Sequence, residues 1–362
     1  MKIKTEILQK MVAKAIQGAS FNKNIPLSSL IGIEYKDDNL ILTTTDGSNQ
    51  FKVSSTEVQL GITEKQPNFY TIVNAEIFSK LVGKTTKEFI ELKNNENYLE
   101  LTGNGAYKLE IAINEEGEMV RFPEIQSNYI EISKIKLNDL QNAIKVAKAS
   151  VAKTTEIPCI TGYYISKTTI TTDRQLVCRL DNELLTEPIL VSNEMAELLL
   201  LVDNSEEIEL SKKDNNLLFT TNEYTIVGKE LEGKELYPVQ PIEKLTQLTY
   251  DNQVKVNKQE LLNILDRMIL FVTDYDKNGI YLDFSTEGIT IQSQKSNAIE
   301  TIEPLEVAER KQFHCLVNIE MLKAQVEVVS VDSVEIYYGQ EKSIKIVDGN
   351  ATYVISLLDK AK

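Results

Sequence analysis

The same pattern occurs three times along this chain, and this repetition restricts the possible folds more than any other feature. A five-residue segment appears at residues 73–77, 191–195 and 317–321, with a spacing of roughly 120 residues. Each copy follows a short apolar strand end and leads into a short amphipathic helix. An Asn or Ser just before the helix is a good N-cap, and the glutamate that follows falls in the positively polarised first turn. The segment therefore predicts three equivalent helix starts.

A second marker follows each copy at a nearly constant distance. Tyr107, Tyr224 and Tyr353 each come roughly 30 residues after the glutamate of the segment that precedes them. Each tyrosine opens a stretch in which apolar and polar residues alternate, and each stretch is preceded by a polar turn and another strand-like run. Alternation with a period of two is typical of half-buried antiparallel strands. We therefore predict a β-hairpin in each repeat.

A third marker precedes both. Helical runs begin near Leu8, Leu140 and Leu261, and hairpin strands follow each of them. The order helix, strands, helix, strands thus occurs three times. We predict an α+β fold of three repeated domains, each with two helices packed on antiparallel sheets. Pro-containing stretches place the domains at residues 1–127, 128–245 and 246–362. The alternative is three unrelated α+β domains with similar patterning.

No residue pattern in the sequence indicates catalysis, a metal or a cofactor. Cys159, Cys178 and Cys315 are widely spaced without a Cys-x-x-Cys pair, so we expect small buried side chains rather than a disulfide framework or a zinc site. The only histidine, His314, lies in a strand-like run, where a structural role is expected. The N-terminus has no hydrophobic signal core, and no apolar run is long enough to span a bilayer. We therefore expect a cytoplasmic protein with no membrane partner.

The distribution of charge is more informative than its sum. The formal net charge of −15 alone argues against a protein that grips phosphates. However, the acidic excess falls largely in strands and turns, whereas lysines recur on the solvent side of the expected helices. Equal domains of this length favour a closed ring over a solenoid. Helices lining such a ring would present to DNA the following cations: Lys10, Lys14, Lys80, Lys84, Lys145, Lys148, Arg267 and Lys323.

With these features, the sequence resembles the bacterial DNA polymerase III beta subunit family of DNA sliding clamps, as a divergent member. The matching motifs are Thr45-Asp46-Gly47, Thr172-Asp173, Phe122-Pro123, Tyr237-Pro238 and Tyr353-Val354-Ile355. The resemblance implies a non-enzymatic homodimer, paired head to tail into a ring of six similar domains. Such a ring encircles double-stranded DNA without sequence preference. It tethers the replicative polymerase, the clamp loader and other proteins that carry a clamp-binding motif.

The resemblance also implies a groove between the second and third domains that receives short peptides. The matching positions are mostly apolar, as expected of a site that buries hydrophobic anchors. They are Ile160, Thr172, Leu176, Pro238, Val239, Asn318, Met321, Ser343, Val354, Ile355, Ser356, Leu357 and Leu358. Plain packing in the domain core is the alternative interpretation of these apolar positions.

The groove also departs from the pattern of the family. The segment after Thr172-Asp173 is one residue shorter, and Pro241 stands close behind Tyr237-Pro238, where the family has Arg-Val. Met321 replaces a bulky tyrosine, and Leu357 replaces a near-terminal proline. We therefore expect the groove to prefer a different peptide or to bind more weakly.

Three other functions are compatible with parts of the sequence. The first is a clamp-like decoy that sequesters clamp partners without encircling DNA, which the acidic total favours. The second is an enzyme that uses paired carboxylates, such as a glycosidase, but the chain contains 54 acidic residues and close pairs arise by chance. The third is a trimeric ring like the cellular and archaeal clamps. Those clamps have two domains per chain, so three domains favour a dimer.

Overall fold

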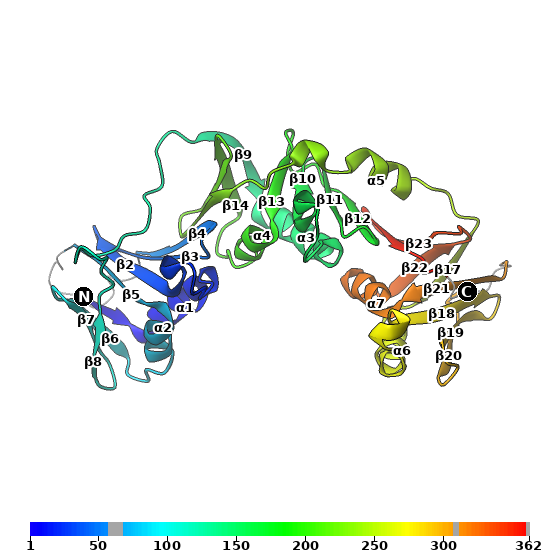
Figure 1. The fold of residues 1–362 in the computed structure, drawn as a ribbon, viewed down its shortest axis with the longest axis horizontal. Coiled ribbons are helices and arrows are strands. Elements are labelled where there is room, and N and C mark those ends of the chain that lie inside the picture. The colour runs from blue at the N-terminus through cyan, green and yellow to red at the C-terminus, as the bar shows by residue number, and fades with distance from the viewer. Residues whose placement is uncertain (57–67, 307–310, 360–362) are drawn as a thin grey trace. The chain divides into compact units, whose positions relative to one another are not determined.

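The fold consists of two compact units, each formed by two stretches of the chain. The computed structural model describes residues 1–56, 68–306 and 311–359. Unit 1 comprises Met1–Leu137 and Glu194–Glu230, and unit 2 comprises Asn138–Asn193 and Leu231–Lys362. Each unit contains one eight-stranded and one four-stranded sheet, in which neighbouring strands are antiparallel (Figure 1).

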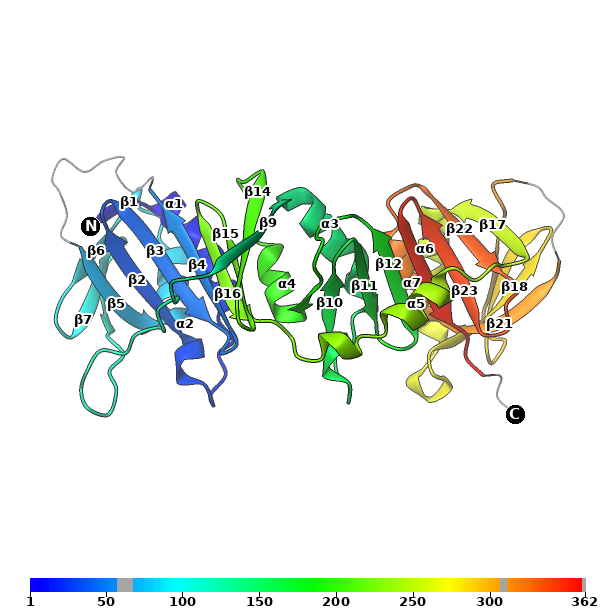
Figure 2. The same ribbon diagram turned by 90° about the horizontal axis from the view of Figure 1, so that it is seen from above.

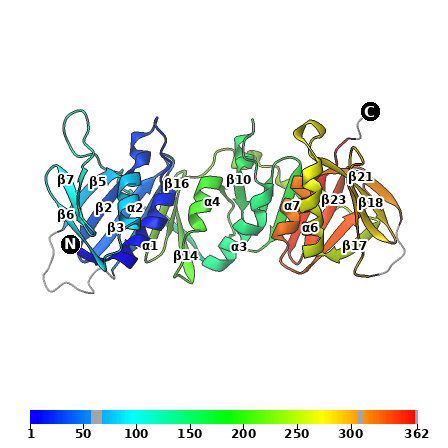
Figure 3. The same cartoon turned by 90° about the horizontal axis from the view of Figure 1, so that it is seen from below.

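Unit 1 contains the sheets β5-β2-β3-β4-β16-β15-β14-β9 and β1-β6-β7-β8. Its helices α1 and α2 cover one face of the strands β2 to β4 (Figure 3). The elements are β1 (Lys2–Lys4), α1 (Thr5–Ala15), η1 (Ile16–Gly18), η2 (Pro26–Ser29), β2 (Leu30–Lys36), β3 (Asn39–Thr45), β4 (Asn49–Ser55), β5 (Phe69–Asn74), α2 (Ala75–Gly83), β6 (Phe89–Asn94), β7 (Tyr98–Thr102), β8 (Ala106–Glu110), β9 (Ile130–Lys136), α4 (Asn193–Leu199), β14 (Glu207–Lys213), β15 (Asn216–Thr220) and β16 (Tyr224–Lys229).

Unit 2 contains the sheets β13-β10-β11-β12-β24-β23-β22-β17 and β20-β19-β18-β21. Helices α6 and α7 lie side by side against the sheets (Figure 3). The elements are α3 (Leu137–Ala147), η4 (Lys148–Ser150), η5 (Pro158–Thr161), β10 (Gly162–Ile165), β11 (Thr168–Thr172), β12 (Leu176–Asp181), β13 (Ile189–Ser192), η6 (Lys234–Leu236), α5 (Val239–Thr246), β17 (Asn252–Asn257), α6 (Lys258–Met268), η7 (Ile269–Phe271), η8 (Asp274–Asp276), β18 (Gly279–Ser285), β19 (Gly288–Ser293), β20 (Ile299–Ile302), β21 (Phe313–Asn318), α7 (Ile319–Val328), β22 (Ser333–Tyr338), β23 (Ser343–Asp348) and β24 (Ala351–Ser356).

Local sequence accounts for where the helices begin. The side chain of Asn74 accepts a hydrogen bond from the backbone N–H of Ile77 at 2.9 Å, and Asn318 accepts one from Met321 at 3.1 Å. These are N-caps of α2 and α7, as the repeated segment predicts. In α1, the apolar positions Leu8, Met11, Val12 and Ala15 are all buried, which leaves the lysines of the helix outside the core.

The two eight-stranded sheets are formed by pairing between successive repeats. Each repeat contributes two four-stranded sets of strands, which we call half-sheets. Pairing of β4 with β16 joins the first and second repeats, and pairing of β12 with β24 joins the second and third. The predicted α+β fold with three copies of helix, strands, helix, strands is therefore confirmed.

The second repeat is divided between the two compact units. Of the predicted domain 128–245, residues 128–137 and 194–230 lie in unit 1, and residues 138–193 and 231–245 lie in unit 2. This division follows from the two joints, because each half-sheet of the second repeat is hydrogen-bonded to a different neighbour. The domain boundaries at 127/128 and 245/246 stay predictions. Among the described residues, no helix is long and apolar enough to cross a membrane.

Candidate functional site

The eight cations expected to face DNA lie on helices or directly after them, and five of them form ion pairs within the chain. On α1, the side chain of Lys10 pairs with Glu6 at 3.1 Å, one helical turn earlier. On α2, Lys80 pairs with Glu76 at 2.5 Å in the same arrangement. Both lysine side chains are mostly exposed, so these pairs are worth only a fraction of a kcal/mol and do not hold the lysines firmly (about 0.3–0.5 kcal/mol).

Lys14 is held more tightly than the other cations of unit 1. Its ammonium group pairs with the carboxylate of Asp203 and donates a hydrogen bond of 2.7 Å to the hydroxyl of Tyr224, which itself donates to Asp203 at 2.6 Å. Burial and the adjacent Asp203 raise the pKa of Tyr224. Burial alone would raise the pKa of Asp203, but the hydrogen bonds from Lys14 and Tyr224 outweigh it and lower that pKa. Lys14 therefore links α1 of the first repeat to strand β16 of the second.

In unit 2, Arg267 and Lys323 are also neutralised by acidic neighbours. The guanidinium of Arg267 donates two hydrogen bonds to Glu300, at 2.9 and 2.5 Å, and this contact lowers the pKa of that carboxyl. Lys323 pairs with Asp266 at 2.7 Å and with Glu327 at 3.5 Å. The remaining three cations, Lys84, Lys145 and Lys148, are exposed. Neither Lys84 nor Lys145 has an ion-pair partner within the described ranges of the chain.

The residues expected to line a peptide groove all lie in unit 2, and about half of them are buried. The buried members are Ile160, Thr172, Leu176, Ser343, Val354 and Ile355. The partly exposed members are Pro238, Val239, Asn318, Met321, Ser356, Leu357 and Leu358. Asn318 caps α7 and also donates to the carbonyl of Lys277 at 2.9 Å, and Ser343 shares a hydrogen bond of 2.8 Å with the hydroxyl of Tyr250.

The structure brings only some of these residues together. Ile160 and Val354 belong to one hydrophobic cluster, against which Val239 packs. Across the β12–β24 joint, Val177 lies opposite Val354 and Leu176 lies opposite Ile355. Because successive side chains of a strand point to opposite faces, Leu176 and Ile355 lie on the other face of the sheet from Val354. The set is therefore divided between the two faces.

A tight turn carries the shortened segment between β11 and β12. The hydroxyl of Thr172 donates to the carbonyl of Leu176 at 2.8 Å, and Asp173 accepts hydrogen bonds from the N–H groups of Gln175 and Leu176. Unit 1 has the same hydrogen-bond pattern at residues 45–49. In that turn Gly47 has φ +102°, whereas in unit 2 the equivalent residue is Arg174, with φ +81°. A non-glycine residue in this region costs roughly 1–2 kcal/mol, so the turn of unit 2 is strained.

Sequence reasoning missed helix α5, which forms within the stretch after Tyr237-Pro238. It lies on the face of the eight-stranded sheet that is in front in Figure 2, opposite to α6 and α7. Ile242 of α5 is buried in the cluster with Ile160 and Val354, and Leu245 packs against it. The spacing of Val239, Ile242 and Leu245 by three residues was the available signal for this helix.

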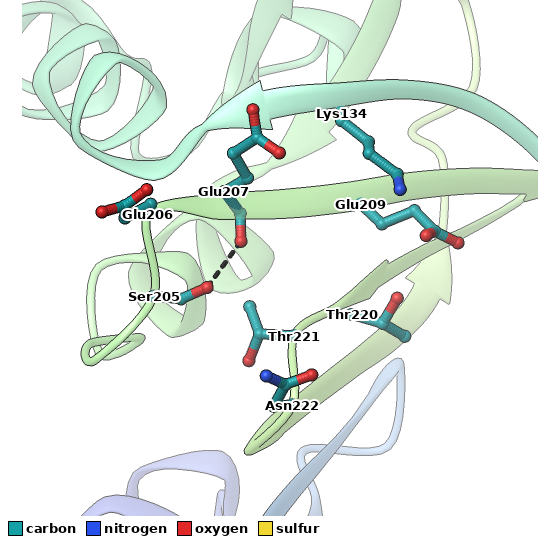
Figure 4. A pocket seen from close by; sticks show the side chains of 8 residues that line it. All are labelled: Lys134, Ser205, Glu206, Glu207, Glu209, Thr220, Thr221 and Asn222. Carbon is teal, nitrogen blue, oxygen red and sulfur yellow. Dashed lines mark hydrogen bonds between the residues drawn. The ribbon is translucent and has the colours of Figure 1, made fainter.

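Unit 1 contains an open polar cavity of about 420 Å³ that the sequence did not predict. It is lined by Lys134, Ser205, Glu206, Glu207, Glu209, Thr220, Thr221 and Asn222. Figure 4 shows that the three carboxylates point in different directions, and the hydroxyl of Ser205 donates to the backbone carbonyl of Glu207 at 2.6 Å. Acid–base chemistry on a glycosidic bond needs two carboxyls that converge on one bond, so this cavity does not support a glycosidase.

The side chains of the cysteines and of the single histidine make packing contacts. Cys159, Cys178 and Cys315 are buried thiols, as expected, and burial raises the pKa of the Cys178 thiol. His314 lies on β21, where its ring stacks on Tyr281 with a centroid distance of 4.8 Å and its Nδ1 contacts Asp283. Across the described parts of the chain, no group of His, Cys, Asp and Glu side chains is arranged to hold a metal ion.

Comparisons with known proteins agree with the resemblance in the sequence. Residues 1–120 match the sequence model of the family described as "DNA polymerase III beta subunit, N-terminal domain". The search of curated proteins found no match. Among solved structures, the DNA polymerase III beta subunit of Borrelia burgdorferi superposes with a TM-score of 0.87 at 19% identity, over 99% of each chain. The sliding clamp of Bacillus subtilis and the beta subunit of Thermotoga maritima each give a TM-score of 0.83, at 16% and 15% identity, over 99% of each chain.

The sequence match of residues 1–120 and the structural likeness over 99% of the chain both point to DNA polymerase III beta subunits. At identities as low as these the structural likeness identifies the fold, and the family match identifies the first domain. The resemblance to the bacterial DNA polymerase III beta subunit is thereby confirmed: residues 1–120 match the N-terminal domain of that family, and the whole chain has the sliding-clamp fold.

Proposed function

We propose that the protein is a DNA sliding clamp, a non-enzymatic cytoplasmic homodimer that closes into a ring around double-stranded DNA. The ring binds DNA without sequence preference. It tethers a replicative polymerase, a clamp loader and other proteins with clamp-binding motifs through the peptide groove of unit 2. The domains 1–127, 128–245 and 246–362 supply six similar modules to the ring.

The observation that carries this proposal is that, among the described residues, one half-sheet at each end of the repeat series is not joined to another half-sheet. The three repeats contribute six half-sheets, and the β4–β16 and β12–β24 joints combine four of them into two eight-stranded sheets. The other two remain four-stranded, with β8 at an edge of one and β20 at an edge of the other. In the order of the repeats, β8 is equivalent to β16 and β24, and β20 is equivalent to β4 and β12. A third joint of the same kind therefore needs β20 of one chain and β8 of another.

The existing joints predict the register of the proposed one. Lys52 lies opposite Thr225 in the first joint, and Arg179 lies opposite Thr352 in the second. From Lys52 and from Arg179, the paired residues can be followed across the next two strands of the sheet to a third strand. In both cases the path ends at a residue three positions before the first residue of the following helix. In the third repeat, the same path starts on β21, three positions before the first residue of α7. It crosses β18 and β19 and reaches Ile299 on β20.

The corresponding ladder in the first repeat ends at Ala106 of β8. The joint between two chains therefore sets Ile299 opposite Ala106 of the second copy. Two such joints, related by a twofold axis, close the pair of chains head to tail. Trimeric clamps have two domains per chain, so three domains per chain favour a dimer over a trimer.

Apolar side chains lie exposed near the free edge of unit 2. Helix α6 packs against β20 and continues into η7, where Leu270 is 78% and Phe271 is 46% exposed. Ile299 on β20 itself is 62% exposed. Large aliphatic and aromatic side chains together with an open strand edge favour strand addition, in which backbone hydrogen bonds and apolar contacts act together.

The paired cations support a clamp that slides. We propose Lys10, Lys14, Lys80, Lys84, Lys145, Lys148, Arg267 and Lys323 as the DNA-facing set. Five of these eight are neutralised by acidic neighbours, so direct attraction to phosphates is weak. A ring held by topology does not need strong phosphate contacts, and weak contacts permit sliding. The same observation also favours the second candidate, a clamp-like decoy that binds clamp partners without encircling DNA.

Retention on DNA of different topology separates the two candidates. The protein is loaded onto nicked circular DNA by a bacterial clamp loader, and half of the sample is then cut to linear form. We expect the protein to stay on circles through gel filtration and to leave linear DNA from its ends. Equal retention on circles and linear DNA, or none on either while partner peptides still bind, would instead identify the decoy.

A further inference from the structure

A hollow lies at the joint between the first and second repeats, within unit 1. It has a volume of about 340 Å³. Residues from the turn before β4, from β4, β15 and β16, and from the connection before β9 line it. All of these residues belong to unit 1, so none of them belongs to the groove set proposed for unit 2.

The lining of the hollow nevertheless corresponds to that groove set. The correspondence follows from strand pairing at the two joints, from the matching turns at residues 45–49 and 172–176, and from the aromatic residue before each proline. The counterparts are Asn49 and Leu176, Pro123 and Pro238, Asn216 and Ser343, and Val227 and Val354. The hollow is therefore the equivalent, in unit 1, of the proposed peptide groove.

The two sites differ in chemistry. Asn49 occupies the position of Leu176, and Gln50 occupies the position of Val177. An aliphatic anchor packed against these amides would remove their hydrogen bonds to water and supply none in return. The hollow therefore does not suit a peptide with aliphatic anchors, and its ligand must be polar.

Gln50 brings an unsatisfied acceptor to the hollow. The residue is only 9% exposed, and its amide nitrogen donates to the carbonyl of Pro123 at 3.1 Å. That bond sets the orientation of the amide and leaves its carbonyl oxygen as the remaining group. Within residues 1–56, 68–306 and 311–359 this oxygen has no hydrogen-bond partner. A ligand that displaces water from it must bring a donor.

Other polar side chains of the lining also have spare hydrogen-bonding capacity. The amides of Gln126 and Asn216 and the hydroxyl of Tyr129 make no hydrogen bond to another described residue. Burial raises the pKa of Tyr129, so its hydroxyl stays protonated and can donate. An amide presents a donor and an acceptor side by side, so an amide of a ligand can pair with it in both directions.

Charge restricts the ligand further. Glu124 and Lys229 are the charged side chains of the lining, and both are exposed. Because their signs are opposite, the hollow favours neither a strongly acidic nor a strongly basic ligand. Glutamine and asparagine side chains are uncharged and match the amides of the lining.

We propose that this hollow is a second peptide-binding site, which takes a short segment of a partner protein that carries glutamine or asparagine. A side-chain amide of that segment donates to the free oxygen of Gln50 and pairs with Asn216. The site goes beyond the proposed function, which places partner binding in unit 2. It rests on that function only in taking the groove of unit 2 as the model of a peptide site. Since the two linings differ, the same peptide motif does not fit both.

The test is a selection of random heptapeptides, displayed on phage, against the immobilised full-length protein. Recovered peptides are synthesised with fluorescein, and their binding is measured by fluorescence anisotropy. We expect a class of peptides with glutamine or asparagine whose affinity falls about tenfold or more in the Gln50→Val and Asn216→Val proteins. Gln17→Val is the matched control, because it removes an exposed amide that does not line the hollow. It should leave the affinity unchanged.

Two variants keep the test decisive. Gln50→Val also removes the hydrogen bond to Pro123, whereas the Asn216 side chain has no hydrogen bond to lose within the described chain. Thermal unfolding confirms that each variant is folded. The proposal is overturned if no recovered peptide loses affinity for either variant. It is equally overturned if the peptides that do lose affinity carry only aliphatic side chains.

The hollow and the ring can fail separately, because the selection needs neither DNA nor a clamp loader. A peptide that depends on Gln50, found with a protein that is not retained on circular DNA, would support the hollow and contradict the ring. Retention on circular DNA without any such peptide would support the ring and contradict the hollow.

Discussion

At the scale of single residues, the Lys14 contact shows how a cation expected to meet DNA is used within the chain. Its ammonium group, the hydroxyl of Tyr224 and the carboxylate of Asp203 form a closed set of hydrogen bonds. The sequence indicated that Lys14 lies off the apolar stripe of α1, and the structure agrees. The acidic partner could not be predicted, because Asp203 belongs to the second repeat and only the fold brings it close to α1.

Replacing Lys14 by methionine should destabilise the protein in a pH-dependent way. We expect a loss of about 1 kcal/mol at neutral pH, since the pair is only partly exposed and Tyr224 also loses a partner. The folded-state pKa of Asp203 is lowered, so the contribution of the pair is complete above the unfolded-state pKa of ~3.9 and is lost as pH falls through the folded-state value. Urea unfolding at pH 7 and pH 3 measures both values.

The difference between the unaltered and Lys14→Met proteins should therefore shrink in acid. Lys10→Met is the matched control, because Lys10 is on the same helix and its side chain is 75% exposed. It should change the unfolding free energy by less than about 0.5 kcal/mol. A Lys14→Met effect that is the same at both pH values would contradict the role assigned to Asp203.

The turn before β12 offers a second residue-scale prediction. Arg174 has φ +81° where the equivalent residue of unit 1 is Gly47, so Arg174→Gly should raise the free energy of unfolding by about 1 kcal/mol. Gln175→Gly is the control, since that residue is not in the left-handed region and glycine there gains nothing. Thermal unfolding of both variants provides the measurement, and a less stable Arg174→Gly protein would show that the arginine side chain has a stabilising contact.

At the scale of elements, the repeated segments predicted well what depends on local sequence. Asn74 and Asn318 cap helices as expected, and the hairpins containing Tyr107, Tyr224 and Tyr353 are β7–β8, β15–β16 and β23–β24. Helix α5 was missed because its eight residues include Pro241, which is unusual within a helix, and because its apolar stripe has a partner only in the folded sheet.

The arrangement of the residues of the proposed peptide groove could be predicted only in part, for a similar reason. The apolar positions were found from the sequence, but strand alternation divides them between two faces and α5 covers one of these faces. Periodicity reports which residues share a face of one strand. It does not show how the strands of different repeats are joined. That joining decides which face of the combined sheet each residue occupies.

An element-scale prediction concerns η7. Leu270→Glu places a charge among the apolar side chains beside β20 and should give a monomer at micromolar concentration in light scattering, because burying the carboxylate in the joint is costly. Ile130→Glu is the control, since Ile130 is 74% exposed on β9, which belongs to neither of the four-stranded sheets. A Leu270→Glu protein that stays dimeric would exclude this part of unit 2 from the interface.

At the scale of the whole molecule, the account depends on repetition continuing across two chains. Two joints between repeats exist within the chain, and the unpaired partners of a third joint, β8 and β20, lie at opposite ends of the repeat series. The three repeats could be counted from the sequence. The joints between repeats could not be predicted from the sequence. They pair strands from different repeats, such as β4 with β16, and no local pattern indicates such a distant partner.

The most direct measurement is cysteine crosslinking across the proposed third joint. The protein carrying Ala106→Cys and Ile299→Cys is oxidised mildly, and the products are separated without reductant; the native cysteines are buried and do not compete. The account predicts a covalent dimer with both bonds formed, and no crosslink when Ala106→Cys is combined with Thr301→Cys in place of Ile299→Cys. Monomers alone, or longer covalent chains without a closed dimer, would contradict a head-to-tail ring.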